Sequence, residues 1–263
     1  MGERKTYHRG RRKKKKGGII STLILIIAIA VFCVSGYQLY KIFGGYHQGK
    51  SEYDKVREVA VHGDDKDEDE FVVDFDELKK INADTVGWIR FYPEPSQISY
   101  PLVQTTDNDL YLNRTFSANE NTVGAIFVNC DNASDFSDRN TIIYGHRMRD
   151  HSMFHDLEKY KDESFWKENP YFYIYTPDGR KLTCHIYSAG IVKDTSSTYL
   201  TQFASDEEYQ AFLDDTKRAG AYHTGVEVTT DQRVVTLSTC TAASDDSRMV
   251  VRGVIESEDV VKK

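Results

Sequence analysis

The 263-residue sequence predicts a mainly β domain, a barrel or a sandwich, preceded by one membrane-spanning helix. Three observations lead to this fold class. Many short segments rich in β-branched and aromatic residues are separated by turn signals. Strands do not alternate regularly with helices, which argues against a doubly wound parallel sheet. One stretch near the N-terminus is apolar and long enough to cross a membrane.

The first 40 residues combine a basic tail with an uncharged stretch. Residues 1–16 hold nine Lys or Arg and one acid, whereas the 24 residues 17–40 hold no charged side chain. A helix of that length measures roughly 36 Å, enough for a hydrocarbon core of about 30 Å. A cleaved signal peptide is the alternative, but its apolar region usually has only ~7–15 residues. The positive-inside rule predicts a cytoplasmic tail (1–16), a transmembrane signal anchor (17–40) and an extracellular remainder.

Charge separates a linker from the domain that follows it. Residues 41–70 include the acidic run 64–70, which lacks EF-hand spacing, so we expect an extracellular stalk rather than a calcium site. Removing the tail's nine bases and one acid from totals of 34 and 41 leaves 25 basic and 40 acidic residues, a net charge near −15. A nucleic-acid partner needs a basic face and is not expected. Residues 71–263 suit one domain.

Four cysteines are too few and too scattered for a disulfide framework. The sequence has no C-x-x-C pair and no histidine cluster at the spacing of metal ligands, so we expect neither a metal site nor a cofactor. Three thiols follow the predicted membrane helix, and an odd number outside the cell leaves one unpaired. A functional thiol would explain this, and a buried inert one is the alternative.

The helices of the domain are marked by capping signals. Asp74 and Glu77 form a capping box for a short first helix. A second helix is expected over 153–160, with a possible extension to Trp166. The third is the best defined, because Ser205 and Glu208 form another capping box and an apolar stripe follows over 205–219.

The strands are bounded by turn residues. The segment 176–179 places Pro and Gly where a tight turn needs them, which predicts a hairpin. The strands that we expect span 86–91, 100–104, 124–129, 140–144, 171–175, 181–192, 226–228, 233–238 and 249–255.

Cys240 is the candidate nucleophile, because it ends a predicted strand and can project into a cleft. Two antiparallel strands joined by the short loop 241–247 would bring it close to Arg248, whose guanidinium could hold an oxyanion. An inert thiol and a surface arginine are the alternative on spacing alone. Cys184 and His185 are neighbours on one strand and point to opposite faces, so Cys184 is expected in the core. Cys130 begins a polar loop without a further signal.

His146 is the candidate proton donor among eight histidines. It follows the apolar strand 140–144 through Gly145, which permits a sharp exit from the strand. His151 and His155 flank the start of a predicted helix, and the others lie in the tail, the linker, a strand and a loop. A structural loop histidine is the alternative on this pattern alone.

Two motifs resemble the sortases, membrane-anchored cysteine transpeptidases of Gram-positive bacteria. They are the run 236–240 (TLSTC) with its downstream arginine, and the run 140–146 (NTIIYGH). The resemblance covers about residues 75–256 and implies a closed β-barrel of about eight strands with peripheral helices. The segments 101–104 and 107–112 and the helix at 205–219 resemble class B. By motif the catalytic residues would be His146, Cys240 and Arg248. Residues that match the lining of the sorting-signal groove are Asn108, Leu112, Tyr144, Thr195, Tyr199, Leu200, Ser238 and Thr239.

The resemblance implies an enzyme that cleaves the C-terminal sorting signal of secreted proteins at a Thr–X bond through a thioacyl-enzyme on Cys240. His146 would protonate the leaving amine, and Arg248 would stabilise the oxyanion. A peptidoglycan-precursor amine of the lipid II type would accept the acyl group, which anchors the protein to the cell wall. Because a thiolate and an imidazolium must coexist, the rate should rise and then fall with pH.

Other functions are compatible with parts of this pattern. A pilin-polymerising sortase or a hydrolytic thiol peptidase would use the same intermediate. L,D-transpeptidases place histidine and arginine closer to the cysteine, and papain-like peptidases place cysteine before histidine. A non-enzymatic surface binding module would need no free thiol. The loop 241–247 is short for class B, so recognition near the scissile bond is expected to differ. The polar segment 130–137 also departs from the class B pattern, and we assign it no role.

Overall fold

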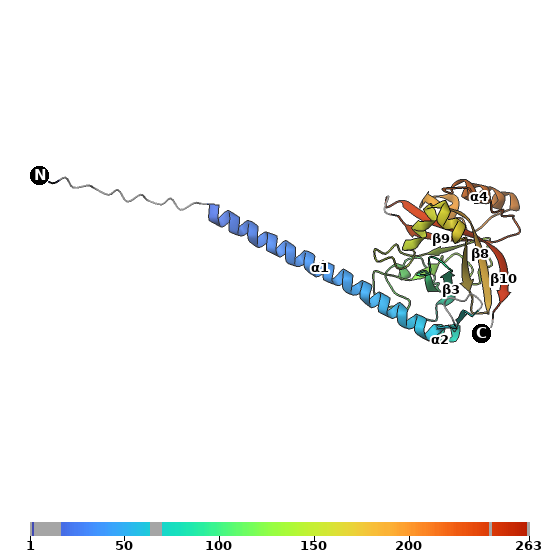
Figure 1. Ribbon diagram of the computed structural model, residues 1–263, viewed down its shortest axis with the longest axis horizontal. Helices are drawn as coiled ribbons and strands as arrows, with labels where there is room; N and C mark the ends of the chain where they lie inside the picture. Colours follow the sequence, from blue (N-terminus) through green and yellow to red (C-terminus); the bar gives the residue numbers. More distant parts are fainter. Residues whose placement is uncertain (1, 3–16, 64–69, 242–243, 262–263) are drawn as a thin grey trace. The chain divides into compact units, whose positions relative to one another are not determined.

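The computed structural model describes residues 2, 17–63, 70–241 and 244–261 (Figure 1). The predicted basic tail, apart from Gly2, and the acidic run at 64–69 lie outside the described residues. The chain divides into two compact units, Met1–Gly44 and Gly45–Lys263. Helix α1 (Gly17–Ala60) contributes to both. Among the described helices, its segment Ile20–Ala60 has the length and apolar composition to cross a membrane, which is compatible with a single-pass anchor.

The last part of α1 packs within the second unit. Tyr53, Val56 and Ala60 are buried in the main hydrophobic core of that unit. The Tyr53 hydroxyl donates to the Gly124 carbonyl at 2.8 Å and accepts the Phe116 N–H at 3.1 Å. An extracellular stalk was expected over 41–70. In the structure, apolar residues at helical spacing give this part of α1 a buried face.

The second unit is built around a closed eight-stranded barrel with the order β10-β8-β7-β3-β4-β5-β6-β9. This confirms the predicted fold class. The pairs β4–β5 and β6–β9 are parallel, and the other pairs in the barrel are antiparallel. The barrel strands are β3 (Thr85–Phe91), β4 (Ser99–Val103), β5 (Ile126–Val128), β6 (Asn140–Tyr144), β7 (Tyr171–Tyr175), β8 (Arg180–Lys193), β9 (Val234–Cys240) and β10 (Ser247–Val260). A separate two-stranded sheet joins β1 (Val61–His62) and β2 (Val72–Val73).

The two faces of strand β9 have different surroundings, one in the barrel interior and the other on the outer surface of the barrel. Val235 and Leu237 belong to the main core, whereas Val234 belongs to a second apolar cluster. Because side chains alternate along a strand, Ser238 and Cys240 face outward with Val234. The outer face of β9 therefore carries the predicted nucleophile.

Helix α4 (Asp206–Arg218) lies at the periphery of the barrel (Figure 1). The Ser205 hydroxyl accepts the Glu208 N–H at 3.3 Å, as the predicted capping box requires. Tyr209, Phe212 and Leu213 fill the second apolar cluster. These contacts confirm the helix predicted at 205–219.

Two predicted elements are wrong. Residues 226–228 do not form a strand, because Val228 is buried in the second cluster, and its backbone joins no ladder within the described sheet. Residues 153–160 are not one α-helix: a 3₁₀ helix, η2 (His155–Lys161), is followed by α3 (Glu163–Glu168). Asp162 separates them, since its extended backbone ends η2 and its carboxylate accepts the Ser164 N–H at 2.9 Å. The helix predicted at Asp74 is α2 (Phe75–Ile81). The remaining short helices are η1 (Leu110–Leu112) and η3 (Ser197–Tyr199).

Candidate active site

Cys240 and Arg248 lie directly opposite each other on neighbouring antiparallel strands. Cys240 is the last residue of β9 and is exposed. Its register partner on β10 is Arg248. Directly opposed residues of an antiparallel pair project from the same face, about 4.5–5.5 Å apart at Cβ. The thiol and the guanidinium thus share the outer face of the barrel. Their pairing on adjacent antiparallel strands agrees with the expectation from the short loop between them.

His146 reaches the same end of the barrel from a parallel strand. Tyr144 on β6 is in register with Ser238 on β9, and the Gly145 N–H donates to the Ser238 carbonyl at 3.1 Å. His146 and Cys240 each follow this register pair by two residues. Because neighbouring parallel strands run in the same direction, the imidazole and the thiol lie at the same end of the barrel.

Three segments contact His146, two at its imidazole ring and one at its main-chain carbonyl. Its Nε2 lies 2.6 Å from the Leu112 carbonyl oxygen. Gly124 has a φ of +66°, and a Cβ there would lie 2.7 Å from the imidazole Cδ2. The Phe154 N–H donates to the His146 carbonyl at 2.9 Å. A Cβ on Gly145 would also meet the Phe154 ring at 2.7 Å, so both glycines are required for this packing.

Arg248 is engaged by its own loop and by one carboxylate. Its Nη1 donates to the Asp245 carbonyl at 2.6 Å, and its Nη2 donates to Asp194 Oδ2 at 3.4 Å. The Asp194 N–H in turn donates to the Asp246 carbonyl at 2.9 Å. The Arg248 side chain keeps a quarter of its surface exposed. The guanidinium is therefore anchored at the edge of the site and accessible from solvent.

A chain of polar contacts joins four of the predicted groove residues. Asn108 Nδ2 donates to Asn129 Oδ1 at 3.4 Å, and Asn129 Nδ2 donates to the Tyr144 hydroxyl at 3.3 Å. The Tyr144 and Tyr199 rings stack with centroids 6.3 Å apart, and the Tyr199 and Ser238 hydroxyls are 2.9 Å apart. Asn108, Tyr144 and Tyr199, all half-buried, thus line one continuous surface beside Cys240, and the buried Ser238 hydroxyl contacts this surface through Tyr199.

Burial keeps the phenols of this surface protonated. It raises the pKa of Tyr144 to about 12, and it also raises the pKa of Tyr199. A neutral phenol offers one O–H donor and an acceptor oxygen. The surface can therefore hydrogen-bond to a peptide backbone without adding a charge.

The other predicted groove residues lie in more varied places. Leu112 is half-buried and contacts His146 through its carbonyl. Thr195 is exposed in the turn that follows β8, and Leu200 is exposed while its carbonyl accepts Asn140 Nδ2 at 2.8 Å. Thr239 differs, because it lies between Ser238 and Cys240 on β9 and so faces the barrel interior, where it is buried. The structure does not bring the Thr239 side chain to the surface beside Cys240.

Several residues that support the site were not predicted from the sequence. Asn129 bridges two groove residues, Asp194 binds the arginine, and Gly124 packs on the histidine. Arg252 is fully buried on β10, where it donates to Ser188 Oγ at 3.0 Å and to Thr198 Oγ1 at 2.7 Å, and so ties η3 to the barrel wall. Of these residues, only Gly124 could have been recognised from the local sequence, because glycine tolerates a positive φ. The contacts of the others join segments that are distant in sequence.

The two remaining thiols of this unit differ from Cys240. Cys184 is fully buried in the main core, and burial raises the pKa of its thiol far above the usual range. It is held as an apolar thiol, as expected. Cys130 is half-exposed, and its N–H donates to Asn108 Oδ1 at 2.9 Å. Cys130 therefore lies beside the groove surface rather than opposite the arginine.

Comparison with known proteins identifies the family of this chain. Residues 94–256 match the sortase domain. Sortase B of Staphylococcus aureus is 31% identical over 231 residues, which cover 88% of this chain and 93% of that protein. Sortase B of Listeria monocytogenes is 32% identical over 240 residues, which cover 87% and 93%. The chain belongs to the sortase family of cysteine transpeptidases, which anchor proteins to the cell wall.

Within that family the chain is a class B sortase. A Staphylococcus aureus sortase B–substrate complex superposes with a TM-score of 0.65 at 35% identity, covering 72% of this chain and 85% of that one. Sortase B from Bacillus anthracis in complex with AAEK1 gives 0.68 at 32% identity, covering 84% and 100%. The closed barrel and peripheral helices are shared with these structures.

Proposed function

We propose that this enzyme cleaves the C-terminal sorting signal of secreted proteins at a Thr–X bond and transfers the acyl group to a peptidoglycan-precursor amine. One observation carries the proposal: the direct pairing of Cys240 with Arg248 at the end of β9, beside the exit of His146 from β6. Nucleophile, oxyanion donor and proton donor then converge on one exposed edge.

In the acylation step, the Cys240 thiolate attacks the carbonyl carbon of the Thr–X bond. The C–S bond forms and the carbonyl electrons move onto oxygen, where the Arg248 guanidinium stabilises the negative charge. Collapse of this intermediate breaks the C–N bond. The leaving amine takes a proton from His146, and a thioester remains on Cys240.

The contact with Leu112 assigns the two nitrogens of His146 to different tasks. A carbonyl oxygen can only accept, so the Nε2 that lies 2.6 Å from it carries a hydrogen. This bond fixes the orientation of the ring. The proton given to the leaving amine is then the one on Nδ1, and deprotonation leaves a neutral imidazole that still donates through Nε2.

In the second step an amine attacks the thioester and expels the Cys240 thiolate, while His146 Nδ1 takes back a proton from the attacking nitrogen. A lipid II-type precursor supplies this amine, which joins the secreted protein to the cell wall. Pilin polymerisation would use a lysine amine at the same step, and water would give hydrolysis. The chemistry of the thioester is shared, so the acceptor distinguishes these outcomes.

Recognition of the signal is assigned to the surface that carries Asn108, Tyr144, Tyr199 and Ser238, with Leu112, Thr195 and Leu200 at its edges. Its neutral amides and hydroxyls suit an extended peptide, whose backbone needs both donors and acceptors. Thr239 supports this surface from the interior. The partners are secreted proteins, a wall-precursor amine and the membrane.

The membrane arrangement belongs to the same proposal. The basic tail at 1–16 stays in the cytoplasm, residues 17–40 cross the membrane, and the catalytic part is extracellular. Residues 41–70 connect the membrane span to the catalytic domain at 71–263. The last turns of α1, which lie within this connection, stabilise the barrel. The acceptor amine and the secreted substrate would both reach the enzyme at the extracellular face of the membrane.

A peptide-library assay tests this function. Full-length protein in detergent micelles is incubated with peptides of randomised sorting-signal sequence, with and without an added short amine. We expect cleavage after Thr, a thioester on Cys240 by mass spectrometry, and ligated product only with the amine. Cys130→Ala is the matched control and should keep activity. A thioester on Cys130, or cleavage that persists in Cys240→Ala, would overturn the assignment.

A further inference from the structure

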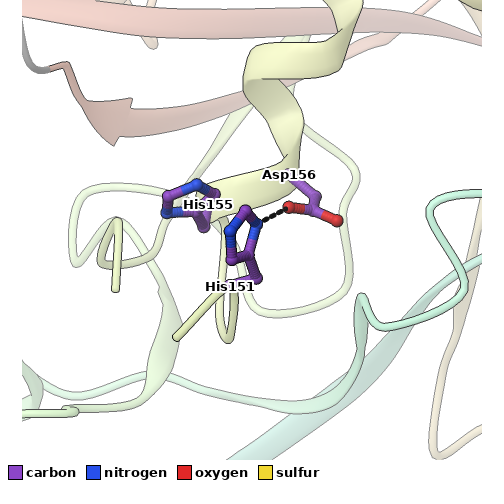
Figure 2. Close-up of side chains that lie close together, drawn as sticks. All are labelled: His151, His155 and Asp156. Carbon is purple, nitrogen blue, oxygen red and sulfur yellow. Dashed lines mark hydrogen bonds and ion pairs between the residues drawn. The ribbon is translucent and has the colours of Figure 1, made fainter. Parts of the chain in front are cut away.

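A second cluster of chemically reactive side chains lies in the segment that follows His146. His151, His155 and Asp156 each offer a ligand atom, and these atoms all lie within 4.8 Å of one another. Figure 2 shows the two imidazole rings side by side, with the Asp156 carboxylate bonded to His151. The ring centroids are 4.1 Å apart, and His151 Nδ1 lies 3.0 Å from Asp156 Oδ1. From this geometry we infer a binding site for one divalent transition-metal ion.

The donor set selects the class of ion. Two imidazole nitrogens and one carboxylate oxygen are ligands typical of zinc, whereas calcium and magnesium require mainly oxygen. Ligand atoms around tetrahedral zinc are separated by roughly 3.3 Å. The ligand atoms would therefore have to approach one another by at most about 1.5 Å. His151 has room to move, because 65% of its side chain is exposed.

An unpartnered nitrogen is an independent sign of a missing ligand. His155 Nδ1 is buried and has no hydrogen-bond partner among the described residues. Buried polar atoms are nearly always paired, so this one requires an explanation. Coordination through Nδ1 would satisfy it. Asp156 offers the matching rigid group, since it is almost fully buried and Lys159 Nζ holds its Oδ2 at 2.9 Å, which leaves Oδ1 toward the imidazoles.

Access and a further coordination position come from a neighbouring cavity of about 490 Å³ that His151 lines. Asp150 and Ser152 line it as well, so its wall near the cluster is polar. A metal ion and its remaining water ligands can enter from this side. Three protein ligands with one open position is a common arrangement for zinc.

The position of the cluster gives the ion a structural effect. His151 and His155 flank Phe154, whose N–H holds the His146 carbonyl and whose ring covers Gly145. An ion bound by both histidines would cross-link the chain on either side of Phe154. It would thereby limit the motion of the segment that carries the catalytic imidazole. No histidine cluster at metal-ligand spacing was expected from the sequence. The left-handed backbone of His151 (φ +65°) and Met153 (φ +56°) turns the chain and brings the two histidines together.

Metal binding is tested on the full-length chain in detergent micelles, purified without a polyhistidine tag and treated with chelator. All measurements use the Cys240→Ala background, so that the catalytic thiol cannot bind the ion. Isothermal titration with Zn²⁺ and visible absorption with Co²⁺ are the probes. We expect one ion per chain and a thermal midpoint that rises with Zn²⁺ but not with Ca²⁺ or Mg²⁺.

Variants locate the site. His151→Ala and His155→Ala should each weaken Zn²⁺ affinity by about tenfold or more and remove the thermal shift. His223→Ala, a loop histidine outside the cluster, should bind normally. If His155→Ala does not fold, the exposed His151 variant decides alone. Absence of saturable binding, or equal affinity in His151→Ala and His223→Ala, would overturn the inference.

Discussion

The two sides of the active site are held in different ways. On the histidine side, the Leu112 carbonyl contacts the imidazole of His146, and Gly124 packs against the ring. The Phe154 N–H holds the main-chain carbonyl of the same residue. On the arginine side, the guanidinium of Arg248 is held by a loop carbonyl and the Asp194 carboxylate. The histidine side is thus held by main-chain groups, whereas a partly exposed ion pair is screened by water.

This difference assigns a different demand to each side during catalysis. In the proposed mechanism, the imidazole would act from its resting position, because its bond to Leu112 leaves Nδ1 available. The guanidinium would have to direct donors toward an oxyanion that forms only in the transition state. The proposal thus combines a preset proton donor with an oxyanion donor that must share its hydrogen bonds. Substitutions on the two sides should therefore have different kinetic signatures.

Removing the nucleophile is expected to have the largest effect. Cys240→Ala should lower turnover on the order of 10⁴-fold or more and abolish the thioester, since neither side can act without the intermediate. Single-turnover mass spectrometry is the measurement. Cys184→Ala should keep the thioester and lower only stability, because Cys184 is buried in the core. The reverse pattern would refute the comparison.

Arg248→Lys tests the arginine side and is expected to lower kcat by ~10²–10³-fold. An ammonium is a point charge and cannot serve the loop carbonyl, Asp194 and the oxyanion together, as a planar fork can. Steady-state kinetics with a sorting-signal peptide measures the loss. Arg218→Lys on the exposed face of α4 is the control. A loss confined to KM would mean that Arg248 binds substrate rather than the oxyanion.

The strands could be predicted from sequence because local signals define them. The β6 and β7 bounds agree with their predictions, since β-branched and aromatic runs end at turn residues there. The failure at 226–228 has a physical reason: Val228 is buried by packing beside α4, and apolar composition alone does not distinguish such packing from a strand. The buried face of α1 was missed because the acidic run beside it suggested a linker.

From the sequence, only those site residues could be predicted that belong to a recognisable motif. The convergence of Cys240 and Arg248 followed from a short loop between two strands. The roles of Asn129, Asp194 and Gly124 could not be predicted, because their partners lie far away in sequence. The register of the barrel strands determines which residues come into contact. The same limit hid the histidine cluster, since two residues with positive φ bring its members together.

Gly124→Ala tests the histidine side and is expected to lower kcat/KM by ~10–10²-fold. The added Cβ would lie 2.7 Å from the imidazole, and the residue would retain a φ of +66°. The ring must move, and Nδ1 moves with it. Gly225→Ala is the matched control, because its φ of +76° gives similar strain with open space around the Cβ. Equal losses in both variants would assign the effect to strain rather than to His146.

Tyr53→Phe tests whether α1 supports the histidine side. It removes the donor to the Gly124 carbonyl and the acceptor of the Phe116 N–H, and both partners then lie unsatisfied in the core. We expect a loss of about 1–2 kcal/mol in the free energy of unfolding and a lower thermal midpoint. Tyr46→Phe on the same helix is the control. A Tyr53 variant as stable as the control would show that α1 does not contribute through this hydroxyl.

Asp194→Asn should have the smallest effect, a two- to fivefold loss in kcat with KM unchanged, on the order of 0.4–1 kcal/mol. The amide can still accept from Arg248 Nη2, so it keeps the hydrogen bond and loses only the charge. Because both side chains are partly exposed, the difference from the native enzyme should shrink as salt is raised. Kinetics at low and high ionic strength separate this charge effect from a structural one. A salt-independent loss above about tenfold would mean that Asp194 fixes Arg248 as firmly as the backbone fixes His146, and the two sides would no longer differ.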